Sequence, residues 1–152
     1  MKVHPEAFNV LLVDAEAPVK LSSPWEHLKL RDNWDKPAGV NDDNCHLMVQ
    51  AMEAWFMADI ETLSEFYGQG FRRNKIPLNN NVENIVKDDL EPSLKLASRS
   101  TSKGEYHKIN HAYKLLGLID VDKVRQASPY CDRFFTTLTA KICIASSQAD
   151  EE

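Results

Sequence analysis

The sequence predicts a single α/β domain with a small, mainly parallel sheet and a helix-rich C-terminal half. Three observations support this. A short β-rich run from Phe8 to Asp14 is typical of a buried strand in a parallel sheet. A second such run covers residues 45–50, and the chain beyond it is rich in helix formers. With 152 residues, the chain is long enough for one substantial hydrophobic core.

The composition limits the class of protein. Hydrophobic residues make up 43% and charged residues 27% of the chain, as in ordinary soluble proteins. No apolar run reaches the length of a membrane span, and the N-terminus lacks a signal-peptide pattern. The net charge of −5 argues against broad nucleic-acid coating but allows a local basic patch. Three cysteines without a CxxC pair indicate thiols in a cytoplasmic protein.

Capping and turn residues predict the elements around the two strands. A short helix begins after Ser23, because proline is favoured at the first helical position and Pro24 stands there. A longer helix covers about residues 53–67 and ends at Gly68, which is a good C-terminal cap. After it we expect a loop over residues 68–81 and a helix over about residues 89–99.

The last third of the chain is predicted to be helical. Asp120 is a suitable N-cap for a short helix through Ala127, and Ser128 with Pro129 opens the final helix. Two apolar faces are expected here, formed by Tyr106, Ile109, Tyr113 and Leu116 and, on the final helix, by Phe134, Phe135, Leu138 and Ile142. Residues 146–152 are polar and predicted to form a disordered tail.

Two acids, Asp14 and Glu16, stand at the end of the first strand. Because side chains alternate along a strand, both should point the same way. Ligands bind at the carboxyl ends of strands in open α/β sheets. Magnesium is commonly held there by one or two carboxylates, with waters and substrate phosphates. The pair therefore predicts a metal site; the alternative is that the strand simply ends in two solvated loop acids.

A second acidic pair, Glu53 and Asp59, flanks an apolar segment after the second strand. If that strand runs to about Met52, Glu53 follows its end and should lie beside Asp14 and Glu16. In one uninterrupted helix, Glu53 and Asp59 would lie on different faces. We include both as candidate metal ligands. The alternative for Glu53 is a favourable acid in the first turn of a helix.

A group of basic residues follows Ser102. Lys103, His107, His111 and Lys114 are expected to share one helical stripe, which would suit contacts with phosphate groups. His107 and His111 could also chelate a metal, but Lys108 stands where the zincin motif requires glutamate. A solvated basic helix face is the other interpretation of this stripe.

Four segments in the same order resemble a bacterial family of domains of unknown function. They are Val10-Leu-Leu-Val-Asp-Ala-Glu16, His46-Leu-Met-Val-Gln-Ala-Met-Glu-Ala-Trp-Phe-Met-Ala-Asp59, Lys103-Gly-Glu-Tyr-His-Lys108 and Val124-Arg-Gln-Ala-Ser-Pro129. That family is similar to Toprim (topoisomerase-primase) domains found in nucleases of phage-defence systems. The resemblance covers nearly the whole chain and implies a Toprim-like fold over residues 1–145.

The resemblance also implies a site. Toprim domains bind magnesium with a D-x-D-type pair and a glutamate from an earlier strand. Asp14 and Glu16 match the pair, with glutamate in place of the second aspartate. The earlier glutamate has no counterpart, so the chain looks like the C-terminal two-thirds of its family. We expect that this leaves one sheet edge unpaired, which favours association with another chain.

We therefore predict a magnesium- or manganese-dependent, nuclease-like domain that acts on nucleic-acid phosphodiesters. The alternative is a catalytically inactive interaction subunit, which would partner an ATPase or itself. The candidate catalytic residues are Glu53 and Lys103. The candidate metal ligands are Asp14, Glu16, Glu53 and Asp59, and the candidate phosphate contacts are Lys103, His107, Lys108, His111 and Lys114.

Overall fold

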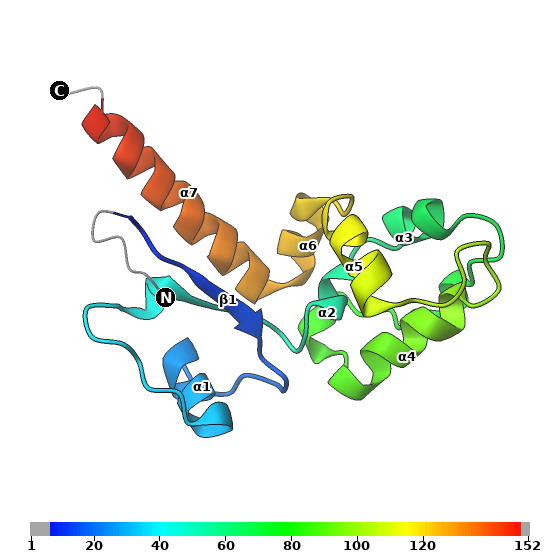
Figure 1. The fold of residues 1–152 in the computed structure, drawn as a ribbon, viewed down its shortest axis with the longest axis horizontal. Helices are drawn as coiled ribbons and strands as arrows, with labels where there is room; N and C mark the ends of the chain where they lie inside the picture. Colours follow the sequence, from blue (N-terminus) through cyan, green and yellow to red (C-terminus); the bar gives the residue numbers. More distant parts are fainter. Residues whose placement is uncertain (1–6, 150–152) are drawn as a thin grey trace.

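The computed structural model describes residues 7–149 and confirms the mixed α/β class (Figure 1). Two strands, β1 (Leu11–Asp14) and β2 (Cys45–Met48), pair in parallel, with Leu11 opposite Cys45 and Asp14 opposite Met48. The α-helices are α1 (Pro24–Asp32), α2 (Glu53–Met57), α3 (Ile60–Tyr67), α4 (Lys87–Ser98), α5 (Lys108–Leu116), α6 (Val121–Ala127) and α7 (Pro129–Ala149). Short 3₁₀ turns occupy Asp42–Asn44, Arg73–Lys75 and Val82–Asn84.

The sheet lies between α1 and α7, which Figure 1 shows on opposite sides of β1. Alternation along the strands assigns their side chains to these two layers. One layer packs on Trp25 and Leu28 of α1 and contains Leu11, Val13, Cys45 and Leu47. The other packs on the aromatic residues of α7 and contains Leu12, Met48, Phe134 and Phe135.

The helices α2 to α6 gather beyond the carboxyl end of β1 and form a second core (Figure 1). Its largest fully buried side chains include Phe56, Tyr67 and Tyr106. Phe56 and Tyr106 meet edge to face, with their ring centroids 6.3 Å apart. The carboxyl end of β1 therefore opens toward a helical body, and this arrangement positions the candidate site.

The predicted helix over residues 53–67 is divided into α2 and α3. The division occurs at Asp59, whose side chain accepts a hydrogen bond from the Thr62 N–H and caps α3. The predicted end at Gly68 is confirmed, and this residue has a φ of 70°, which glycine adopts at little cost. The N-cap role of Asp120 is also confirmed, because its side chain accepts from the N–H groups of Asp122 and Lys123.

The predicted apolar face of α5 was wrong. The helix buries His111, Ala112 and Leu115, while Ile109 and Tyr113 are 78% and 64% exposed. Tyr106 is buried but precedes the helix. The cause is the ring of His111, which packs against the rings of Tyr67, Phe66 and Tyr106. A histidine whose ring nitrogen has hydrogen-bond partners can occupy the core, but a pattern of hydrophobic residues does not identify it.

The last helix follows the prediction only in its first half. Ser128 accepts a hydrogen bond from the Cys131 N–H at the start of α7, and Phe134 and Phe135 pack against the sheet. Ile142 is 64% exposed, so the prediction that it buries this helix was wrong. The helix continues to Ala149, into the predicted tail, and residues 150–152 lie outside the described part of the chain. Among the described helices, none has the length and hydrophobicity needed to cross a membrane.

Candidate functional site

Two carboxylates from distant parts of the chain meet at the carboxyl end of β1. Asp14 is the last residue of β1, and Glu53 is the first residue of α2. Both face the ammonium group of Lys108, the first residue of α5. The Lys108 Nζ lies 3.2 Å from Oε1 of Glu53 and 3.7 Å from Oδ2 of Asp14. The structure thus brings the predicted acids of the two strand ends together and places a lysine between them.

The two carboxylates are held in place by hydrogen bonds. The backbone N–H of Met52 donates to Oδ1 of Asp14 at 2.7 Å. The hydroxyl of Tyr106 donates to Oε1 of Glu53 at 3.0 Å, and the Tyr106 N–H donates to Ser98 Oγ at 2.7 Å. The Glu53 side chain is only 4% exposed, whereas that of Asp14 is 20% exposed. Glu53 is therefore rigidly positioned, and Asp14 has an oxygen that a ligand can reach.

The local charges affect the protonation of the site. Burial, together with the charges of Glu53 and Glu16, raises the pKa of Asp14 against the opposing effects of the Met52 hydrogen bond and Lys108. Burial lowers the pKa of Lys108, but the charges of Glu53 and Asp14 outweigh it and raise that pKa. The acids keep Lys108 protonated, and burial together with the repulsion between the acids raises the pKa of Asp14. Both effects show that positive charge stabilises the cluster.

Glu16 lines the same cavity as Asp14 but lies beyond the end of the strand. The strand ends at Asp14, and Glu16 has a left-handed backbone conformation with a φ of 64°. Strand alternation therefore does not apply to this pair. The Glu16 carboxylate pairs with Lys87, the first residue of α4. About two fifths of each of these side chains remains exposed.

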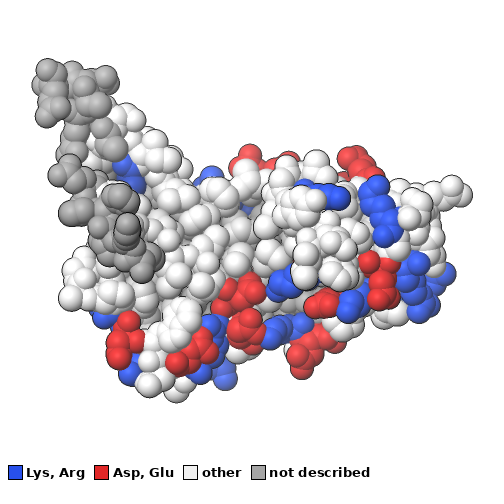
Figure 2. Space-filling model, in the orientation of Figure 1, with Lys and Arg blue, Asp and Glu red and all other residues white. Residues whose placement is uncertain are grey.

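The cavity around these residues has a volume of about 410 Å³. Its wall combines residues from β1, α2, α4 and α5, and its charged groups are Asp14, Glu16, Glu53, Asp88, Glu91, Lys87, Lys95 and Lys108. Figure 2 shows acidic and basic groups side by side where α4 meets the carboxyl end of β1. A wall of mixed sign suits a ligand that itself combines a cation with an anion, such as a metal-bound phosphate.

The donor set fits magnesium in a limited way. Within residues 7–149, no three His, Cys, Asp or Glu side chains are grouped closely enough to hold a metal ion. The site instead offers the two hard carboxylates of Asp14 and Glu53. Magnesium keeps several waters and is bound through one or two carboxylates plus phosphate oxygens. Such a pair therefore fits a metal that arrives with a phosphate.

The structure places Asp59 in a separate cluster. Its side chain is 1% exposed and accepts hydrogen bonds from Lys123 Nζ at 2.7 Å, Thr62 Oγ1 at 2.6 Å and the Asp120 N–H at 2.9 Å. Burial raises the pKa of Asp59, but these hydrogen bonds outweigh it and lower the pKa to about 2. Its oxygens are already used, and it links α3 to α6.

The predicted basic stripe is not one helical face. Lys103 precedes α5, and His107 is the N-cap residue of that helix. Lys103, His107 and Lys114 are exposed, and the Lys103 Nζ lies 5.3 Å from the centre of the Phe66 ring. His111 is buried, and its Nδ1 accepts the His107 N–H at 3.2 Å and faces the Tyr67 hydroxyl at 3.1 Å. His111 therefore supports the helix start rather than presenting its ring to solvent.

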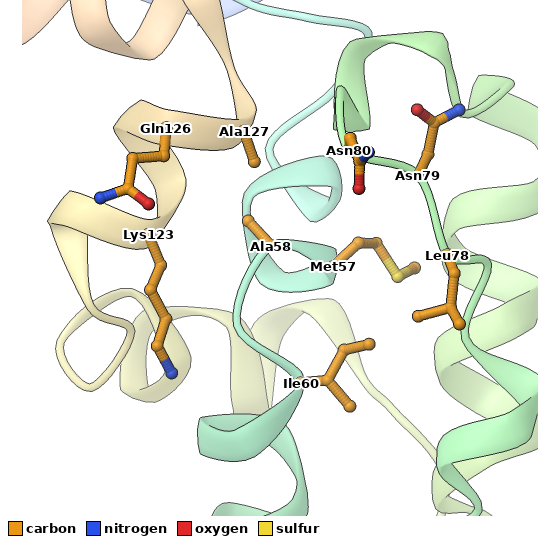
Figure 3. Close-up of a pocket in the computed structure, with 9 residues that line it drawn as sticks. All are labelled: Met57, Ala58, Ile60, Leu78, Asn79, Asn80, Lys123, Gln126 and Ala127. Carbon is orange, nitrogen blue, oxygen red and sulfur yellow. The ribbon is translucent and has the colours of Figure 1, made fainter.

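A second cavity, wider than the one beside Lys108, lies elsewhere in the described chain. It has a volume of about 840 Å³ and lies between α6, the start of α3 and residues 78–80 (Figure 3). Apolar side chains and amides line it, including Met57, Asn79 and Gln126. Its charged lining residue, Lys123, is bound to Asp59 and Glu61. Without an acid in its wall, this cavity lacks the paired carboxylates found beside Lys108.

The sequence analysis missed several residues of the site. It assigned Tyr106 only to an apolar helix face, gave no role to Ser98, Lys87 or Lys95, and did not place Lys108 between the acids. Tyr106 also stood within a segment that carried the family resemblance, which was a further signal for it. Lys87 and Lys95 lie on α4 and have no motif around them, so only the packing of α4 beside β1 reveals them.

Fold and site define a mixed α/β protein with a charged cavity at the carboxyl end of its sheet. The chain belongs to the family described as a domain of unknown function, DUF4276, whose model matches residues 1–139. This agrees with the resemblance to such a family seen in the sequence. Neither a curated protein nor a solved structure matches the chain significantly.

Proposed function

We propose that this protein is a metal-dependent, nuclease-like domain that acts on phosphodiesters. The observation that carries the proposal is the convergence of Asp14 and Glu53 on Lys108 in a cavity at the carboxyl end of β1. Carboxylates that crowd together and are neutralised by a cation are suited to a magnesium ion. A lysine beside them is suited to the phosphate that such an ion carries.

The residues divide the work as follows. Asp14 and Glu53 would hold magnesium or manganese, which when bound polarises a phosphoryl oxygen and activates water. Lys108 would contact the phosphate, since its 51% exposed side chain can turn from the acids toward a ligand. Tyr106 keeps the Glu53 carboxylate oriented through its hydroxyl. Lys103, His107 and Lys114 are exposed and would contact more distant phosphates of a nucleic acid.

The finer assignment is a Toprim-related fold and a role in phage defence. It is supported by the family resemblance and by a parallel strand that ends in Asp14, followed by Glu16. In this proposal the acidic pair of Toprim domains corresponds to Asp14 and Glu16, and Glu53 supplies the additional glutamate. The Glu16–Lys87 pair lines one side of the cavity.

One observation favours a second candidate, a catalytically inactive interaction subunit that partners an ATPase or itself. Lys108 already neutralises Asp14 and Glu53, as a structural lysine would. In that case the cluster only joins α5 to the sheet. The two candidates differ in one property, because a structural cluster does not bind Mn²⁺ and a metal site does.

The test measures metal binding and cleavage together. Mn²⁺ binding is followed by electron paramagnetic resonance, and cleavage is assayed with labelled single-stranded DNA, duplex DNA and RNA in Mg²⁺ or Mn²⁺. We expect Asp14→Asn and Glu53→Gln to weaken Mn²⁺ binding and to reduce cleavage by about 100-fold or more. Lys108→Met should reduce cleavage while Mn²⁺ still binds, because it removes a phosphate contact and no metal ligand.

Glu65→Gln is the matched control, because this exposed acid of α3 lies outside the cavity. It should bind Mn²⁺ and cleave as the parent does. Circular dichroism verifies that each variant is folded. A parent protein that neither binds Mn²⁺ nor cleaves any of the three nucleic acids would reject the nuclease-like function in favour of the interaction subunit.

A further inference from the structure

An apolar surface follows α5 into α6. Among the described residues, fourteen large hydrophobic side chains are exposed, and five of these lie between residues 109 and 121. Ile109, Tyr113 and Leu116 are spaced i, i+4 and i+7, so they form one stripe along α5. The complete group, which we call the α5–α6 surface, is Ile109, Tyr113, Leu116, Leu118 and Val121. Stripes of this spacing are the usual anchors of helix-to-helix contacts between chains.

A small apolar cavity lies at one end of this surface. It has a volume of about 190 Å³ and is lined by Leu116 and Val121 of the surface, with Trp55, Val124 and Phe135 behind them. Trp55 is 6% exposed, and its Nε1 is the one buried side-chain N or O atom in the described part of the chain without a hydrogen-bond partner. At the other end of the stripe, Ile109 protrudes and is 78% exposed. The surface thus carries a protruding aliphatic side chain and a cavity that could receive one.

The two ends of the surface have different charged neighbours. His107 and Lys108 precede Ile109, where Lys108 is paired with Asp14 and Glu53, and the nine residues of α5 include no acid. Asp120 and Asp122 flank Val121 at the other end, and both are exposed. The Lys114 Nζ lies over the Tyr113 ring in the middle, 5.5 Å from its centre. In the view of Figure 2 the surface over α5 is largely free of charged groups.

We infer that the α5–α6 surface binds a second copy of this chain, with the two α5 helices antiparallel and the two-fold axis near Tyr113. A two-fold contact uses the same patch on both copies, so the patch must complement itself. The antiparallel arrangement meets this condition, because it directs Ile109 of each copy toward the cavity beside Leu116 of the other.

This inference is independent of the proposed function, although the two surfaces adjoin. Lys108 belongs to the candidate site and Ile109, its neighbour, to the dimer contact. The cavity around Lys108 in each copy would therefore open next to the other copy. A long nucleic acid could then contact basic residues of both copies, which a monomer would not allow.

The first test is the oligomeric state of the full chain by sedimentation velocity over a range of concentrations. We expect a dimer at concentrations of about 1–100 µM, and a weakening of the dimer by about 100-fold in Ile109→Glu and in Tyr113→Glu. Leu30→Glu is the matched control, because Leu30 of α1 is 80% exposed and lies outside the surface. It should dimerise as the parent does.

The second test addresses the antiparallel arrangement. In a Cys143→Ser background, which removes the exposed native thiol, Tyr113→Cys should form a disulfide-linked dimer on mild oxidation, and Leu30→Cys should not. A residue near a two-fold axis meets its own copy, whereas residues far from the axis do not.

Three results would overturn the inference: a parent that stays monomeric throughout, a dimer that Ile109→Glu leaves intact, or Tyr113→Cys that does not cross-link. A dimer broken instead by Ile142→Glu would assign the contact to α7. A failure of the dimer inference is distinguished from a failure of the proposed function by measuring Mn²⁺ binding to monomeric Ile109→Glu. If this variant binds Mn²⁺, the metal site exists without the dimer.

Discussion

Two lysine–carboxylate clusters join the C-terminal helices to earlier parts of the chain, and they use their carboxylate oxygens differently. In the Asp59 cluster, Lys123 of α6 reaches an aspartate that also accepts hydrogen bonds from Thr62 and Asp120. In the Asp14 cluster, Lys108 of α5 lies between Asp14 and Glu53 at distances of 3.7 and 3.2 Å. Asp14 accepts one backbone hydrogen bond, from Met52.

The difference separates a structural cluster from a candidate functional one. Hydrogen bonds lower the pKa of Asp59 to about 2 despite its burial, so its charge is fully compensated within the fold. Burial raises the pKa of Asp14, whose charge is compensated less well. A carboxylate with saturated oxygens has nothing left for a ligand. A carboxylate that is partly exposed and whose charge is poorly compensated is stabilised when a cation binds.

The largest effect should come from removing Asp59. We expect Asp59→Ala to lower the free energy of unfolding by about 3 kcal/mol, because the change removes an N-cap and leaves buried donors without acceptors. Asp14→Ala should cost about 1 kcal/mol, because it breaks one backbone hydrogen bond and relieves repulsion with Glu53. Urea unfolding measures both.

Glu61→Ala is the control. It removes an exposed acid near Lys123 and should change the free energy of unfolding by less than about 0.5 kcal/mol. Equal costs for Asp59→Ala and Asp14→Ala would contradict the comparison.

The second prediction concerns acid pH. The folded pKa of Asp59, about 2, is below its ordinary value of 3.8, so its contribution to stability is fully present above about pH 4. It is lost as the pH falls through about 2, and it amounts to about 2 kcal/mol. The stability difference between the parent and Asp59→Ala should therefore narrow by this amount between pH 5 and pH 2. Urea titrations at several pH values measure it, and a constant difference would argue against the low pKa.

The third prediction tests whether a metal ion binds at the Asp14 cluster. A ligand that binds only the native state stabilises it, by about 1.4 kcal/mol at ten times its Kd. Mg²⁺ or Mn²⁺ should therefore raise the Tm of the parent by about 4 °C. Asp14→Asn should lose this shift, and Glu65→Gln should keep it. An equal shift in Asp14→Asn would place the bound ion outside the Asp14 cluster.

The smallest effect concerns the exposed lysines near α5. Reversing Lys103 and Lys114 to glutamate should weaken the binding of single-stranded DNA and flatten its salt dependence, by about 0.7 in the log–log slope for each lost phosphate contact. The control is Lys20→Glu with Lys36→Glu, two exposed lysines that precede β2. Fluorescence anisotropy at several salt concentrations measures both. If the two double variants behave alike, the effect is one of net charge only.

The local features of the fold could be predicted from short stretches of sequence. Capping by Asp120 and the helix end at Gly68 were both confirmed. Each of these depends on a few neighbouring residues, whose hydrogen bonds and conformational preferences act over one turn or one strand. The division of the predicted helix at Asp59 was missed, although its N-cap hydrogen bond from the Thr62 N–H is equally local.

The sequence by itself determined that a strand ends in Asp14 and that helices with identifiable caps follow. Only the tertiary structure decided that Asp14 and Glu53 share Lys108, that Asp59 belongs to another cluster, and that α5 buries His111 while exposing Ile109. The physical reason is the range of the interactions. Caps and strand alternation are set by neighbours along the chain. The partner of a charged side chain, and the buried face of an amphipathic helix with two plausible faces, are set by what packs against them.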